Sequence, residues 1–142
     1  MMEQTMPYTQ LALWEPRVLA LLRLVAAILF FEHGLQKLFG FPPRAEGMPA
    51  PEVFSMLWFA AVMELVGGGL LAVGLFTRPT AFLLSGEMAA GYWIAHAPKS
   101  ISPAVNQGDA AILFCFIFLY FAFAGPGSWS LDARRAAGPP KR

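Results

Sequence analysis

Charged residues are scarce in this 142-residue sequence: Asp, Glu, Lys and Arg make up 13% of it, about half their usual share in soluble domains. The formal net charge is only +1, and no basic stretch is interleaved with aromatic residues, so nucleic acid is not expected as a partner. Cysteine occurs once, at Cys115, which excludes an internal disulfide and a CxxC redox pair. Any electron transfer would need a molecule from outside the chain.

Apolar residues dominate, with 57% hydrophobic residues, 13 phenylalanines and a mean hydropathy of +0.55. Each of four apolar segments is long enough to cross a hydrocarbon core of about 30 Å as a helix. The segments are apolar on all sides, which disfavours a β-barrel and a water-soluble bundle. The sequence therefore predicts an all-α, four-transmembrane-helix bundle in the lipid bilayer, with helices at about residues 17–38, 54–76, 79–97 and 104–125.

The connections between these segments are short, so residues 1–142 are expected to form a single membrane domain. A loop at 41–51 is rich in helix-breaking Pro and Gly, and Pro79 suits the first turn of the third helix. A polar tail follows at 126–142. Acidic residues, Glu3 and Glu15, precede the first apolar run where a signal peptide would carry basic ones, so this helix is expected to remain uncleaved.

The Lys and Arg residues outside the hydrocarbon favour an orientation with both termini in the cytoplasm of a bacterial cell, across its inner membrane. The side with the termini would hold Arg17, Arg78, Arg134, Arg135, Lys141 and Arg142. The opposite side would hold only Lys37, Arg44 and Lys99.

Ionisable residues inside the predicted helices are the main candidates for a site, since each costs about 2.5 to 3.5 kcal/mol at the centre of an isolated membrane helix. Depths counted along each helix place Arg23, Glu64 and Glu87 in one inner polar layer. A second, outer layer is expected to contain His33, Lys37, His96, Asn106 and Asp109.

Small residues accompany both acids at helical spacing. Gly68 follows Glu64 after one turn, and Gly91 follows Glu87 in the same way, so each acid is expected to face a closely packed neighbouring helix. Asn106 and Asp109 would share one face of the fourth helix.

Two interpretations of these polar layers remain open from the residues alone. The inner layer could be a structural Arg and Glu pair that fixes helix register, or part of a functional site. In the outer layer, scattered ligands without HxxxH-like spacing do not indicate a metal, whereas hydrogen bonding to a polar headgroup fits His33 and Lys37. The aromatic face of Phe114, Phe118 and Phe121 could line a ring-binding groove or simply face lipid.

Several of these segments resemble the DoxX family of small four-helix membrane proteins. The resemblance covers about residues 17–132 and rests on Arg23, the FFEHGLQKLFG segment that begins at Phe30, Glu64 with the glycines after it, Gly74-Leu-Phe-Thr-Arg78, Glu87, Asn106-Gln-Gly-Asp109 and the GPGSWSLD segment that ends at Asp132. The family usually carries Glu where this chain has Asp109.

The resemblance implies a redox context, because DoxX-like proteins are associated with quinol- or thiosulfate-oxidising membrane complexes and with oxidative-stress defence. The leading hypothesis is a quinone- or quinol-binding subunit without a covalent cofactor, whose ligand-binding candidates are the residues of the two polar layers. If it takes part in catalysis, it would do so as an oxidoreductase subunit dependent on partners. The alternatives are a non-catalytic scaffold that docks soluble redox enzymes through its tail, and a carrier for small acids or protons. Besides soluble redox enzymes, a second copy of the chain is a candidate partner, which would give a homo-oligomer.

Overall fold

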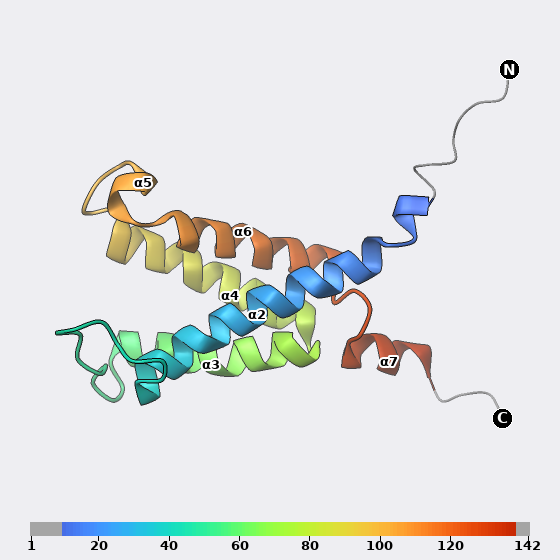
Figure 1. Ribbon diagram of the computed structural model, residues 1–142, viewed down its shortest axis with the longest axis horizontal. Helices are drawn as coiled ribbons and strands as arrows, with labels where there is room; N and C mark the ends of the chain where they lie inside the picture. Colours follow the sequence, from blue (N-terminus) through green and yellow to red (C-terminus); the bar gives the residue numbers. More distant parts are fainter. Residues whose placement is uncertain (1–9, 139–142) are drawn as a thin grey trace, which may run out of the picture.

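The computed structural model describes residues 10–138 as an all-α fold (Figure 1). Two of its helices, α2 and α3, are long and apolar enough to cross a membrane, and α6 is a shorter apolar helix. A five-residue π-helical turn, Tyr92–His96, extends α4. The helices are α2 (Glu15–Phe39), α3 (Met56–Val73), α4 (Thr77–Gly91), α5 (Pro103–Asn106), α6 (Asp109–Ala124) and α7 (Leu131–Ala137).

The first three predicted segments are helical at close to the expected bounds, but the fourth is not a single helix. Its first residues form the separate helix α5, and α6 begins only at Asp109. Gln107 lies between them with a left-handed φ of 60°, which no α-helix accommodates. The expectation that Asn106 and Asp109 share a helix face is therefore wrong. Glu3, Lys141 and Arg142, which supported the predicted start and orientation, lie outside the described residues.

Close backbone contact joins α2 to α3, and α4 packs beside α6 (Figure 1). A Cβ atom on Gly34 would lie 2.5 Å from the backbone nitrogen of Leu65, and one on Gly68 would lie 2.8 Å from that of Phe31. Only glycine permits such an approach of two helices. The predicted small-residue contact at Gly68 is thus confirmed.

Aromatic packing joins α2 to α6 in the core. The ring of Phe30 lies 5.4 Å from that of Phe114 and 4.8 Å from that of Phe118, between centroids. The opposite face of α6 is exposed, as at Phe116 and Phe123, and the other long helices also expose large apolar side chains. Exposed apolar surface of this extent is typical of helices that contact lipid.

The segment after α6 returns to the end of α3 and the start of α4. The carboxylate of Asp132 accepts hydrogen bonds from the amides of Phe76 and Thr77, at 3.0 and 2.8 Å, and so caps the start of α4. Burial alone would raise the pKa of Asp132, but these hydrogen bonds and the nearby Arg135 outweigh burial and hold the pKa below its usual value. Asp132 therefore fixes the segment after α6 to the start of α4.

Candidate functional site

A buried ion pair connects α2 to α3. The Nζ atom of Lys37 lies 2.5 Å from Oε1 of Glu64, whose side chain is only 3% exposed. The contact of Gly34 with Leu65 explains this pairing, because Lys37 lies one turn after Gly34 and Glu64 directly precedes Leu65. The pair joins residues that were predicted to belong to different layers, so the division into two layers is wrong.

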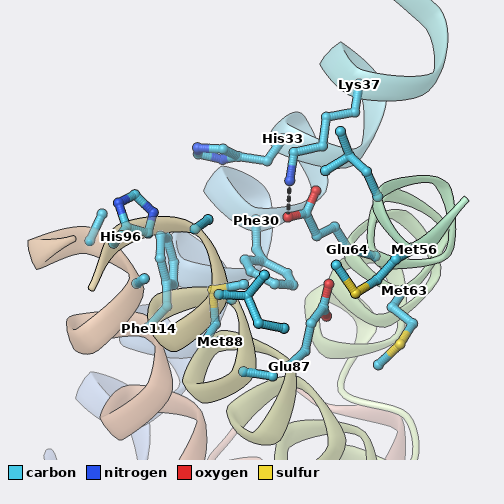
Figure 2. A pocket seen from close by; sticks show the side chains of 18 of the residues that line it. Phe30, His33, Lys37, Met56, Met63, Glu64, Glu87, Met88, His96 and Phe114 are labelled. Carbon is cyan, nitrogen blue, oxygen red and sulfur yellow. Dashed lines mark hydrogen bonds and ion pairs between the residues drawn. The ribbon is translucent and has the colours of Figure 1, made fainter. Parts of the chain in front are cut away.

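A second acid, Glu87 of α4, points toward this pair (Figure 2). Both of its carboxylate oxygens are buried and have no hydrogen-bond partner, and the same is true of Oε2 of Glu64. Buried polar atoms without partners are uncommon in folded proteins, because each loses its hydrogen bonds to water without replacement. Three such acceptors at one place mark this region as a candidate site.

The acids lie on the wall of a cavity of about 760 Å³ between α2, α3, α4 and α6. This volume is in the range typical of small-molecule sites. Met56, Phe59 and Ile94 line the cavity and are also more than half exposed, so the cavity reaches the protein surface. The polar lining residues are His33, Lys37, Glu64, Glu87, His96 and Gln107, and most of the others are apolar, among them Phe30, Met63, Met88 and Phe114.

Two histidines line the cavity from different helical segments (Figure 2). Nδ1 of His33 lies 2.7 Å from the carbonyl oxygen of Leu29, and Nδ1 of His96 lies 3.0 Å from that of Asn106. A carbonyl oxygen can only accept, so each Nδ1 must carry the hydrogen. In the neutral imidazole, Nε2 is then left as an acceptor.

Arg23 belongs to a different part of the molecule. Its side chain is fully buried, and its guanidinium donates to the carbonyls of Leu71 and, at 2.8 Å, Ala72 in the last turn of α3. It also donates to the carbonyls of Pro126 at 2.8 Å and Trp129 at 3.0 Å. The expected pairing of Arg23 with Glu64 and Glu87 is therefore wrong, because backbone carbonyls at the end of α3 and in residues 126–129 take its donors instead.

Asn106 and Asp109, the remaining predicted site residues, do not line the cavity. Asn106 is buried and holds the turn before α6, donating to the carbonyl of Ser100 at 2.8 Å and accepting from the amide of Gly108 at 2.7 Å. Asp109 is exposed at the start of α6. Of the eight predicted ligand-binding candidates, the cavity brings together His33, Lys37, Glu64, Glu87 and His96.

Sequence reasoning missed two features of this site. The cavity-lining methionines gave no signal, because an apolar residue in an apolar segment is uninformative. Gly91 was expected to contact a helix, but a Cβ there would meet nothing within 4 Å. The stripe that runs from Glu87 through Gly91 therefore forms a wall of the cavity. Among residues 10–138, no three His, Cys, Asp or Glu side chains are placed to hold a metal ion.

Comparison with known proteins places this chain in a family. The DoxX family model matches residues 18–97. An uncharacterized protein of Haemophilus influenzae is 42% identical over 122 residues, which cover 84% of this chain and 91% of that protein. Inner membrane protein YphA of Escherichia coli is 28% identical over 92% of this chain and 99% of its own length.

The uncharacterized membrane protein Rv3486 of Mycobacterium tuberculosis is 31% identical over 80% of this chain and 78% of its own. No solved structure matches. The family model covers more than half of the chain, and the relatives align over most of it. This chain therefore belongs to the DoxX family of membrane proteins.

Proposed function

We propose that this protein binds a lipid-soluble molecule with a polar head, of the quinone and quinol class, in the cavity between α2, α3, α4 and α6. The observation that carries the proposal is the pair of buried acids, with three oxygens that have no partner, at the wall of an otherwise apolar cavity of about 760 Å³. A ligand head that hydrogen-bonds there would remove the desolvation penalty of these oxygens.

The apolar part of the cavity suits the rest of such a ligand. Phe114 offers aromatic surface to a flat ring, and the methionines can adapt to an isoprenoid chain. The exposed lining residues, such as Phe59 and Ile94, would face acyl chains in a bilayer. A molecule dissolved in the membrane could therefore enter from the side.

The proposal includes a chain that crosses the inner membrane four times, with both termini in the cytoplasm. Its support is the set of apolar helices α2, α3, α4 with its π-helical turn, and α6, together with the distribution of basic residues. We expect a Cys introduced at Gly138 to react with an impermeant maleimide only after spheroplasts are lysed. A Cys at Glu46 should react in intact spheroplasts, and the reverse pattern would contradict this orientation.

A substitution that fills the cavity tests whether the ligand binds there. Gly91→Leu adds a side chain into open space, so we expect normal folding and at least about tenfold weaker binding of a decyl-tailed benzoquinone to the protein in nanodiscs. Binding is measured by partition of the radiolabelled quinone, corrected with empty nanodiscs.

The matched control is Ala136→Leu, which adds the same side chain at an exposed position of α7 outside the cavity. It should bind the quinone as the wild type does. Equal affinity of the wild type and of Gly91→Leu, with both proteins folded, would show that the quinone does not occupy this cavity.

A further inference from the structure

We infer that this cavity selects a ligand head that donates hydrogen bonds, and that within the quinone couple it binds the reduced, dihydroxy form in preference to the oxidised dione. This inference rests on the proposed function and specifies the ligand of the same site. It follows from an inventory of the hydrogen-bonding atoms at the cavity wall.

Three buried polar atoms among the residues that line the cavity are acceptors without partners. They are Oε2 of Glu64 and both carboxylate oxygens of Glu87, and all three are buried. Oε1 of Glu64 already accepts from Lys37. An ionised carboxylate offers lone pairs only, so a carbonyl oxygen placed beside these atoms would meet another acceptor.

The two histidines increase this excess of acceptors. The bonds from Nδ1 to the carbonyls of Leu29 and Asn106 leave Nε2 of His33 and of His96 as acceptors in the neutral rings. Donors are fewer: the remaining hydrogens of Lys37 Nζ, and the amide of Gln107, which is exposed and offers an acceptor as well. One proton on the acid pair would convert one of the three oxygens into a donor and leave the other two oxygens and both Nε2 atoms as acceptors.

The quinol and the quinone differ in whether they can donate hydrogen bonds to these acceptor atoms. A quinol donates through two hydroxyl groups, whereas a quinone can only accept. A hydrogen bond to a charged partner corresponds to about tenfold or more in affinity. An alkylammonium also donates, but the aromatic surface of Phe114 at the cavity wall favours a ring.

The test compares the binding affinity of the decyl-tailed hydroquinone with that of its benzoquinone, using the full chain in nanodiscs without oxygen. Decylamine is added as a competitor. We expect the hydroquinone to bind at least about tenfold more tightly. In Glu87→Gln the amide N–H can donate to a dione, so the preference should vanish or reverse. Asp109→Asn, a similar change at an exposed position outside the cavity, should keep the wild-type preference.

The outcomes separate this inference from the function on which it rests. If the wild type binds both forms with equal affinity and Gly91→Leu still lowers that affinity, the preference is overturned but the binding site is supported. Binding of neither form would overturn both. Decylamine that binds more tightly than the hydroquinone would also overturn the assignment of a dihydroxy ring, whereas retained preference in Glu87→Gln would show that this acid does not set it.

Discussion

Arg23→Met should destabilise the folded protein by at least about 3 kcal/mol, because the carbonyls of two segments lose their buried donors at once. The guanidinium satisfies carbonyls at the end of α3 and in residues 126–129. Methionine fills a similar volume and donates nothing. The free energy of unfolding, measured by denaturant titration in mixed micelles, should fall, and protease should cleave near residue 126 at lower concentrations.

Two further variants show whether hydrogen-bond geometry is responsible. Arg23→Lys keeps the charge, but an ammonium cannot bridge both segments as a planar guanidinium does, so we expect a smaller loss that is still clear. Arg17→Met removes an exposed guanidinium whose hydrogen bond to the carbonyl of Leu13 is 3.4 Å long, and should change stability by less than about 0.5 kcal/mol. Stability of Arg23→Met equal to that of Arg17→Met would contradict this role.

Gly34→Leu is expected to force α2 away from α3 and to lower both stability and ligand affinity. The atoms that a Cβ would meet belong to the backbone of Ala61 and Leu65, which cannot rotate away as a side chain could. The loss of close packing should cost roughly 2 to 4 kcal/mol. Because the same contact brings Lys37 to Glu64, quinol affinity should fall in the fraction that remains folded.

The control for this variant is Gly69→Ala, which places a methyl group 3.8 Å from the ring of Phe31, an ordinary contact. It should retain both stability and ligand affinity. Gly34→Ala should lie between the two, because even a single methyl group overlaps the backbone at 2.5 Å. Unchanged unfolding of Gly34→Leu would mean that the two helices are not held at this distance.

The elements of the fold that depend on local chemistry follow from the sequence. Long apolar runs must satisfy their backbone polar groups internally, which leaves the helix as the simplest solution, and the first three predicted segments are helices in the structure. Arg23, Phe30 and Gly34, which recur at helical spacing, lie on one buried face of α2. Asn106-Gln-Gly108 interrupts the fourth segment, because side-chain hydrogen bonds of Asn106 stabilise a turn there, which apolarity alone did not indicate.

The partners of the buried ionic groups were decided only by the tertiary structure. Depth counted along separate helices ignores their rotation and the reach of a long side chain, so Lys37 was assigned to a layer apart from Glu64 although the two form an ion pair. Arg23 was matched with acids because acids are visible in a sequence, whereas its actual partners are backbone carbonyls, which every residue carries. The sequence thus determined which charged residues lie in apolar segments, and three-dimensional packing determined which of them are buried and what each one meets.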